Sequence, residues 1–319
     1  MFSLKKKFNK AMVTGGAGFV GSHLVEELLK EGLEVVSIDD LSNGKLENLE
    51  EFKNDPKLKI VECDVTDKEA LREQFDGVDI VFHQACSKMT VCLKDPARDL
   101  EVNGNGTLNI CLLAKEFGVK KIVHASSGSV YGTVTKFPSD ESHQLNPVSY
   151  YGVSKLAGEK YVRAFHELYD MDTTILRYYH VFGPKQDSSD LGGVVSIFGR
   201  RVLNEEPPLV HGDGKQVRSF TFVKDVVNIN LTVAMAECTA GEAYNCASGV
   251  QVSVRDLAEK VVAYYDSNVD IVHEGHKIGD IRFFDVDNSK IKSLGFDFNY
   301  NFEQGLASTL EWLKKAVKG

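Results

Sequence analysis

Tyr151 and Lys155 stand four residues apart in the segment Tyr151-Gly152-Val153-Ser154-Lys155. On a helix, residues four apart share a face, so this phenol and this ammonium group can point into one cleft. A free tyrosine has a pKa of about 10, and a nearby cation lowers that pKa because it stabilises the phenolate. The pair therefore predicts a general base for an alcohol hydroxyl, and its alternative is a contact on a helix surface. Tyr150 has no lysine at the same spacing.

A glycine-rich turn lies near the start of the chain, in Thr14-Gly15-Gly16-Ala17-Gly18-Phe19-Val20-Gly21. It follows a short apolar run and precedes a helical pattern. Gly15 suits a tight turn, Gly18 lets the backbone approach a pyrophosphate, and Gly21 lets the helix pack closely on a sheet. We expect this turn, including Phe19 and Val20 at the helix start, to bind a dinucleotide. A purely structural loop is the alternative.

Two acidic positions refine that expectation. Asp39 ends the second apolar run, where a carboxylate can accept hydrogen bonds from the ribose hydroxyls and repel the 2′-phosphate of NADP. Asp64 and Val65 follow the third run, where an adenine edge would lie. The sequence therefore favours NAD, whose cationic nicotinamide could act with Lys155 to lower the pKa of Tyr151 toward neutrality.

A serine-rich stretch, Ala125-Ser126-Ser127-Gly128-Ser129-Val130-Tyr131-Gly132, follows the fifth apolar run. Loops after the carboxyl ends of parallel strands are where ligands bind in doubly wound sheets. A serine here can hydrogen-bond the reacting oxygen beside Tyr151, and the alternative for each serine is a turn residue.

The elements that must position these residues alternate between strand and helix. Strands are expected at 11–13, 34–38, 58–61, 79–82, 121–125 and 173–176, with a helix at 103–117 and a long helix before the sixth strand. Short apolar runs between helices predict an α/β fold, a Rossmann-type doubly wound parallel sheet. Helices at 194–203, 225–237, 253–265 and 302–316 predict a smaller C-terminal α/β substrate-binding lobe. We expect an NAD-binding domain at 1–180 and a second lobe mainly at 181–319, with chain crossings possible.

The three motifs, in this order and spacing, resemble the extended short-chain dehydrogenase/reductase superfamily. Within it, the sequence is similar to nucleotide-sugar epimerases of the UDP-glucose 4-epimerase kind. The resemblance covers nearly the whole chain, including Leu176-Arg177-Tyr178-Tyr179-His180-Val181-Phe182-Gly183-Pro184, which looks like the substrate loop of the family.

The resemblance implies roles for individual residues. Ser127 would be the catalytic hydroxyl and a substrate ligand, Tyr151 the base, and Lys155 its activator and a ligand of the nicotinamide ribose. Lys88 falls where some epimerases place a cofactor-contacting lysine, and Asn103 matches an asparagine that supports the cofactor site. The implied substrate positions also include Ser129, His180 in place of the usual asparagine, His211, Arg218, Asp280 and Arg282. Arg218 and Arg282 would hold the UDP phosphates, and Asp280 would contact the uridine ribose.

Departures from the family pattern favour one reaction. Related dehydratases typically carry an Asp-Glu pair directly after the catalytic hydroxyl residue, where this chain has Gly128 and Ser129. Decarboxylases of the group usually have Glu where Ser129 stands. We therefore expect a UDP-sugar 4-epimerase that works through a transient 4-keto sugar with reversible hydride transfer to NAD. A UDP-sugar dehydratase, decarboxylase or reductase is the alternative, and a non-catalytic NAD-binding regulator is a more distant one.

Composition limits the partners. The 319 residues include 37 basic and 46 acidic side chains, and a net charge of −9 argues against nucleic acid. No stretch predicts a membrane span or a signal peptide, and no spacing indicates a metal site. The six cysteines lack paired spacing and read as reduced thiols of a cytoplasmic enzyme. Apolar stripes in the helices near 105–116 and after Tyr151 cover the sheet or, by the resemblance, pair across a two-fold axis as the four-helix bundle of a homodimer.

Overall fold

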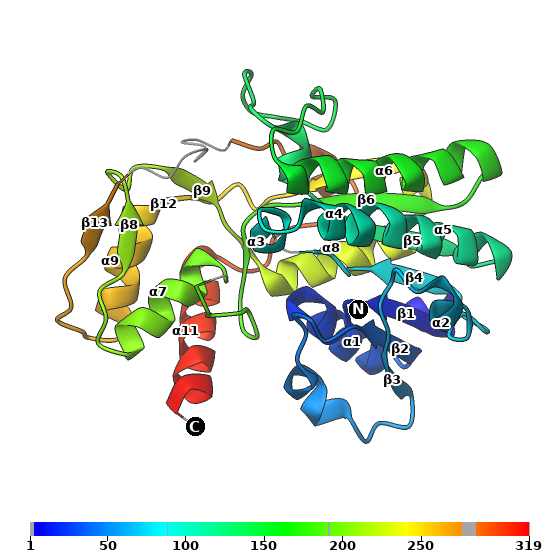
Figure 1. Ribbon diagram of the computed structural model, residues 1–319, viewed down its shortest axis with the longest axis horizontal. Coiled ribbons are helices and arrows are strands. Elements are labelled where there is room, and N and C mark those ends of the chain that lie inside the picture. Colours follow the sequence, from blue (N-terminus) through cyan, green and yellow to red (C-terminus); the bar gives the residue numbers. More distant parts are fainter. Residues whose placement is uncertain (1–2, 88, 191, 276–284, 319) are drawn as a thin grey trace.

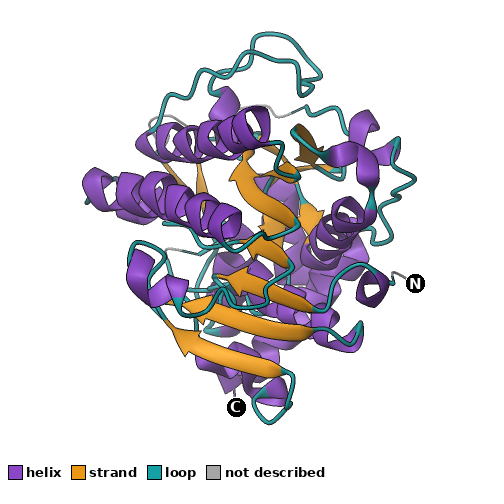
Figure 2. Ribbon diagram, turned by 90° about the vertical axis from the view of Figure 1, so that its right-hand side faces the viewer, coloured by secondary structure: helices purple, strands orange, loops and turns teal. Residues whose placement is uncertain are grey.

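The computed structural model describes residues 3–87, 89–190, 192–275 and 285–318. In these ranges the main sheet has seven parallel strands in the order β11-β6-β5-β4-β1-β2-β3. The strands are β1 (Lys10–Thr14), β2 (Glu34–Asp39), β3 (Leu58–Glu62), β4 (Ile80–His83), β5 (Lys121–Ser127), β6 (Thr173–Tyr178) and β11 (Glu242–Cys246). Helices cover both faces of this sheet (Figure 2). The expected Rossmann-type α/β fold is confirmed, and each expected strand lies within two residues of its expected bounds.

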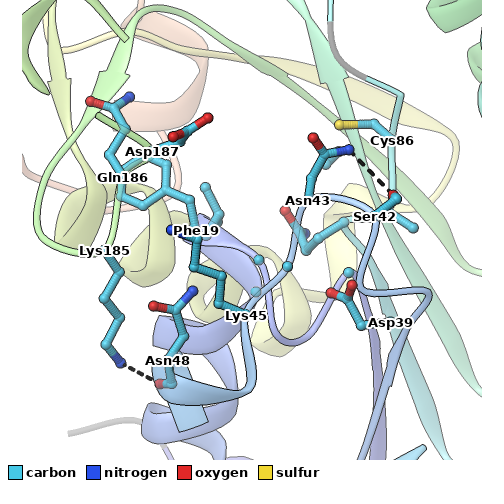
Figure 3. Close-up of a pocket in the computed structure, with 18 of the residues that line it drawn as sticks. Phe19, Asp39, Ser42, Asn43, Lys45, Asn48, Cys86, Lys185, Gln186 and Asp187 are labelled. Carbon is cyan, nitrogen blue, oxygen red and sulfur yellow. Dashed lines mark hydrogen bonds between the residues drawn. The ribbon is translucent and has the colours of Figure 1, made fainter. Parts of the chain in front are cut away.

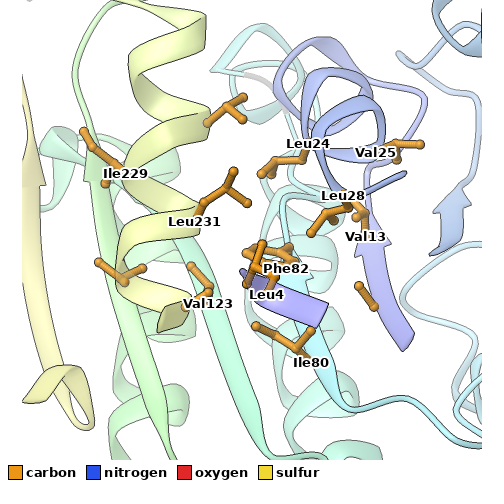
Figure 4. Close-up of a cluster of buried hydrophobic side chains, with 14 of the residues drawn as sticks. Leu4, Val13, Leu24, Val25, Leu28, Ile80, Phe82, Val123, Ile229 and Leu231 are labelled. Atoms are coloured by element: carbon orange, nitrogen blue, oxygen red, sulfur yellow. The ribbon is translucent and has the colours of Figure 1, made fainter. Parts of the chain in front are cut away.

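One face of the sheet is covered by α1 (Phe19–Lys30) and α8 (Val223–Met235), which contact each other. Figure 4 shows Leu24 and Leu28 of α1 and Leu231 of α8 meeting the strand residues Val13 and Phe82. These side chains are fully or almost fully buried. Their removal from water is the main force that holds α1, and with it the glycine turn, at a fixed height above the sheet.

The other face is covered by α5 (Thr107–Glu116) and α6 (Tyr150–Tyr169), with the short helices α2 (Lys68–Arg72), α3 (Met89–Cys92) and α4 (Pro96–Leu100) nearby. The helix expected at 103–117 is interrupted, because Glu101–Gly106 forms a π-helical segment, η3, before α5 begins. Single π-type turns inside α-helices occur often at functional sites.

The smaller lobe lies at the left of Figure 1 and is built around α7 (Val194–Leu203), α9 (Val254–Tyr264) and α11 (Phe302–Lys318). Three short strand pairs accompany these helices. They are β7 (Val181–Phe182) with β10 (Thr221–Phe222), β9 (Val217–Ser219) with β12 (Gln251–Ser253), and β8 (Leu209–His211) with β13 (Val272–Glu274). The short segments η1 (Leu4–Lys6), η2 (Leu46–Phe52), η4 (Gly128–Tyr131), η5 (Glu237–Thr239) and α10 (Ser289–Lys292) complete the described elements.

The chain passes between the two lobes more than once. After β7 and α7 in the smaller lobe, it returns to the main sheet as α8 and β11, and then leaves again for α9. Phe19 and Val20 of α1 pack against the apolar core of the smaller lobe. The start of α1 therefore touches both lobes. Among the described helices, none combines the length and the apolar composition needed to cross a bilayer.

Candidate active site

The glycine turn joins β1 to α1 and leaves room only for backbone. Gly15 has a φ of +66°, and a Cβ there would lie 2.8 Å from the Ala85 amide nitrogen. A Cβ on Gly21 would lie 2.0 Å from the Gly15 carbonyl oxygen. Side chains at these positions would overlap the protein's own backbone, so glycine is what lets β1, the turn and α1 pack this closely. The N-terminus of α1, where unpaired amides favour an anion, lines the cavity described below.

Asp39 ends β2 beside this turn and is only 7% exposed. Its carboxylate accepts hydrogen bonds from the amides of Ala17 and Leu41, each at 3.0 Å. Burial raises the pKa of Asp39 despite these bonds. A Cβ on Gly44 would lie 2.4 Å from the carboxylate, so the loop after β2 closes tightly over it. The remaining lone pairs of the Asp39 carboxylate can accept hydrogen bonds from the hydroxyls of a ribose.

Asp64 and Val65 follow β3 at the same edge of the sheet. Asp64 accepts a hydrogen bond from the Thr66 amide at 2.9 Å, and Asn109 of α5 donates to the Val65 carbonyl at 3.1 Å. Burial favours the neutral acid, but the Thr66 amide and the Arg98 guanidinium outweigh it and lower the pKa of Asp64. The loop thus presents a fixed carboxylate, an acceptor of the kind that an adenine amino group requires.

Asn103 lies in η3 and is almost fully buried. Its side chain accepts from the Ser87 amide at 3.0 Å and donates to the Ser154 hydroxyl at 2.9 Å. It therefore connects the loop after β4 to helix α6, which carries Tyr151 and Lys155. Asn103 does not line the cavity described below, so its geometry is that of a support.

Helix α6 brings the tyrosine and the lysine to the end of β5. Ser149 caps the helix by accepting from the Gly152 amide at 3.1 Å, so Tyr151 lies in the first turn. The Lys155 ammonium donates to the Ala125 carbonyl at 2.6 Å, and the Ser127 hydroxyl is hydrogen-bonded to Tyr151. Tyr150, the neighbouring tyrosine, is 60% exposed and does not line the cavity.

Burial sets the charge state of these groups. It raises the pKa of Tyr151 well above its ordinary value, and the hydrogen bond from Ser127 counteracts this only in part. Burial also lowers the pKa of Lys155. Removal from water disfavours the phenolate of Tyr151 and the ammonium of Lys155. An added positive charge in the same space would therefore stabilise the phenolate and lower the pKa of Tyr151.

One cavity of about 1140 Å³ joins these features. Most of the expected cofactor and catalytic residues line it, namely Gly15, Gly18, Phe19, Val20, Asp39, Asp64, Val65, Ser127, Tyr151 and Lys155. The buried hydroxyls of Ser87 and Ser126 also line it and have no hydrogen-bond partner among the residues that the structure describes. Such orphaned polar groups suit a polar ligand.

The substrate positions are more scattered. His180 lines the cavity with a φ of +34°, and burial together with the nearby Arg218 lowers its pKa to about 3. Arg218 is buried on β9 and donates to the Val217 carbonyl at 2.9 Å. Ser129 donates its amide to the Ser127 hydroxyl, but its own side chain lies outside the cavity lining, as do Arg218 and His211. Lys88, Asp280 and Arg282 lie outside the described residues.

Several cavity residues were not expected from the sequence. Asn43 and Lys45 of the loop after β2, and Lys185 and Gln186 of the loop after β7, also line the cavity. Figure 3 shows Lys185 reaching across to the Asn48 carbonyl, to which it donates at 3.0 Å. Arg98 lines the cavity next to Asp40 and Asp64, a part that we call the adenosine arm because the adenine and its ribose are expected there. Helix α11 closes the far wall with Trp312, Leu313, Ala316 and Val317. The polar run after Asp39 could have indicated that the loop after β2 lines a ligand site. The position of α11 beside the cavity depends on tertiary packing, which no local sequence pattern indicates.

A family model described as the NAD dependent epimerase/dehydratase family matches residues 11–247. The chain belongs to that family. Its cofactor is NAD, and the residues present fit it, since the glycine turn at the start of α1 and the Asp39 carboxylate line one cavity, where they can receive a pyrophosphate and a ribose. In the described ranges no three His, Cys, Asp or Glu side chains gather closely enough to hold a metal ion.

Three similar proteins illustrate the range of the family. The chain is 35% identical over 310 residues to a UDP-glucose 4-epimerase of Mycolicibacterium smegmatis, covering 96% of this chain and 98% of that protein. It is 33% identical over 319 residues to a UDP-N-acetyl-alpha-D-glucosaminuronate decarboxylase of Bacillus cytotoxicus, covering 96% and 98%. A crystal structure of UDP-glucose 4-epimerase with UDP-glucose from Thermotoga maritima matches with a TM-score of 0.91 and 35% identity, covering 97% and 99%.

Proposed function

We propose that this epimerase-family enzyme is a UDP-sugar 4-epimerase that works through a transient 4-keto sugar. One observation carries the proposal: Ser127, Tyr151 and Lys155 meet at the carboxyl end of β5 inside the cavity that the glycine turn opens. A hydroxyl, a phenol and an ammonium group are the set required to deprotonate a secondary alcohol and later to return the proton.

Tyr151 acts as the base for the sugar C4 hydroxyl. When bound, oxidised NAD supplies a hydride acceptor and a positively charged ring. In the protein alone, burial keeps Tyr151 protonated, so its activation needs that added positive charge as well as Lys155. The Lys155 ammonium donates one of its three protons to the Ala125 carbonyl, which leaves two to donate to the Tyr151 phenol and to the nicotinamide ribose. Ser127, bonded to Tyr151, aligns the sugar oxygen for proton transfer in both directions.

The space after Ser127 supports epimerisation over dehydration. A Cβ on Gly128 would lie 2.3 Å from the Tyr179 ring, so that ring fills the place where an acidic side chain would start. The next residue, Ser129, has no carboxylate, which also disfavours a decarboxylase that depends on Glu there. A reductase or a non-catalytic regulator remains the alternative, but the intact Tyr151 and Lys155 pair favours turnover.

For the substrate, we infer that His180 contributes a neutral imidazole to the cavity. Arg218, which lies behind His180 and outside the cavity lining, is proposed for the diphosphate of a UDP-sugar on the family resemblance alone. The pKa of about 3 at His180 means that the ring carries no charge at neutral pH. It can donate one hydrogen bond and accept one, as the asparagine of the family pattern also can. His211, Asp280 and Arg282 stay candidates for the nucleotide end.

We also infer a homodimer in the cytoplasm. Leu112 of α5 and Val153, Tyr161 and Leu168 of α6 are exposed apolar residues on two helices that contact each other. Their exposed fractions run from 37% to 71%, and such a patch commonly marks an interface. All six cysteines are free, which suits a reducing compartment.

The reaction is tested with UDP-sugars that carry deuterium at C4. UDP-glucose, UDP-N-acetylglucosamine and their uronic acids are incubated with the enzyme, and the products are read by NMR and mass spectrometry. The proposal expects the C4 epimer with deuterium retained at C4 and no net NADH. A product that has lost water or carbon dioxide, or a net reduction of the sugar, would overturn it.

A further inference from the structure

Arg98 reaches from α4 into the adenosine arm of the cavity and contacts acidic residues of three segments. Its guanidinium is hydrogen-bonded to the Asp64 carboxylate after β3 and lies 3.6 Å from the Asp40 carboxylate after β2. A third contact, at 3.1 Å, goes to Glu101 at the start of η3. The guanidinium is planar and forked, so it can bridge carboxylates from separate loops.

The backbone of α4 fixes where this side chain starts. Asp95 caps the helix by accepting from the Arg98 amide at 2.9 Å, and Pro96 occupies the first helical turn. The Arg98 side chain is 31% exposed, so its ion pairs are partly shielded from solvent. Partial burial makes such a pair stronger than a fully exposed one.

The cavity wall around Arg98 is acidic. Asp39, Asp40 and Asp64 all line this arm, and Arg98 is paired with two of them. Asn109 already holds the backbone of the Asp64 loop, at the carbonyls of Val65 and Thr66. The orientation of the Asp64 carboxylate therefore depends on the amide and the hydroxyl of Thr66 and on Arg98.

We propose that Arg98 is a positioning residue for the adenine of NAD. It aims the Asp64 carboxylate at the adenine amino group and cancels part of the acidic charge at this end of the cavity. The inference rests on NAD as the cofactor and not on which UDP-sugar reacts, so it can be tested without any sugar substrate.

The test measures binding of NAD and of nicotinamide hypoxanthine dinucleotide, in which an oxygen replaces the adenine amino group. Calorimetric titrations use protein that has been freed of nucleotide and shown by circular dichroism to be folded. We expect Arg98→Gln to weaken NAD binding roughly tenfold or more, because a charge-assisted contact is lost. We also expect the preference for NAD over the hypoxanthine analogue to shrink, because Asp64 is no longer aimed.

Two further variants separate charge from geometry. Arg98→Lys keeps the positive charge but not the fork, so NAD affinity should recover in part while base preference does not. Arg72→Gln is the matched control, since Arg72 of α2 pairs with Glu69 of the same helix and with Glu116 of α5, and it does not line the cavity. The proposal is overturned if Arg98→Gln binds NAD within twofold of wild type, or if it loses both dinucleotides equally.

Discussion

The phenol of Tyr151 begins as a poor base, since its burial favours the protonated form. If Tyr151 is the base, as proposed above, this burial is a safeguard, because proton abstraction then becomes effective only when a positive charge occupies the same cavity. The half-buried Tyr151 and the exposed Tyr150 are adjacent in sequence, which makes them a natural pair for comparison.

We expect Tyr151→Phe to lower kcat for epimerisation by a factor of about 10² to 10⁴, the usual contribution of a general acid or base. NAD binding should persist, because the glycine turn and Asp39 are untouched. The measurement is steady-state epimerisation together with NAD content after denaturation. Tyr150→Phe is the control and should keep wild-type kcat. Equal activity of the two variants would contradict the assignment of Tyr151.

Asp225, at the start of α8, offers a pH test of stability. It is fully buried, its Oδ1 accepts from the Asn299 amide at 3.0 Å, and burial raises its pKa from 3.8 to about 6. The folded protein therefore binds an extra proton between these values, so this contribution to stability is present below about pH 4 and is lost as the pH rises through about 6.

Asp225→Asn removes that dependence while keeping an oxygen acceptor for Asn299. We expect the free energy of unfolding of the variant, relative to wild type, to rise by about 2 to 3 kcal/mol between pH 4 and pH 7. Urea unfolding at both pH values measures the difference. A constant difference between the two proteins across this range would show that Asp225 does not titrate there.

At the scale of elements, the contact between α6 and η3 depends on Gly158. A Cβ at this position would lie 2.8 Å from the Asn103 carbonyl oxygen and 3.1 Å from the Thr107 hydroxyl. We expect the overlap introduced by Gly158→Ala to destabilise the protein by about 1 to 3 kcal/mol. The better helix propensity of alanine offsets up to about 1 kcal/mol of that loss. Since Lys155 lies one turn earlier, kcat should fall as well.

Thermal unfolding and steady-state kinetics test this prediction. Gly275→Ala serves as the control, since a Cβ there meets no atom of the described residues within 4 Å. A Gly158→Ala protein with wild-type melting temperature and kcat would contradict this prediction, because it would mean that η3 can move away from α6 at no cost in stability or activity.

The elements were predictable where local pattern decides them. The glycine turn, Asp39 and the Tyr151 helix followed from spacing, and the strands from short apolar runs. The π-helical segment at Glu101–Gly106 was missed because one wider turn inside a helix leaves no periodic signal in the sequence; in the structure this segment packs against α6. Arg98 was missed for a similar reason, since a charged residue on a short helix usually faces solvent. Its acidic partners come from loops that only the sheet order brings together.

At the scale of the whole molecule, the exposed apolar face of α5 and α6 remains to be covered. If two copies pair there, wild-type protein at micromolar concentration should have twice the chain mass by light scattering. Leu112→Glu combined with Leu168→Glu should yield monomers, because charges on both helices would be buried without partners. Leu46→Glu, at a position 47% exposed on η2, is the control and should stay dimeric. A monomeric wild type would refute the assembly.

The C-terminal helix gives the protein a built-in optical reporter. Trp312 is the single tryptophan of the chain, and it lines the same cavity as the cofactor turn. Its emission overlaps the absorption of a reduced nicotinamide, so excited indole can pass its energy to NADH held nearby. Fluorescence of the unlabelled enzyme can therefore reveal in real time any molecules stranded in the reduced state after a ketosugar escapes.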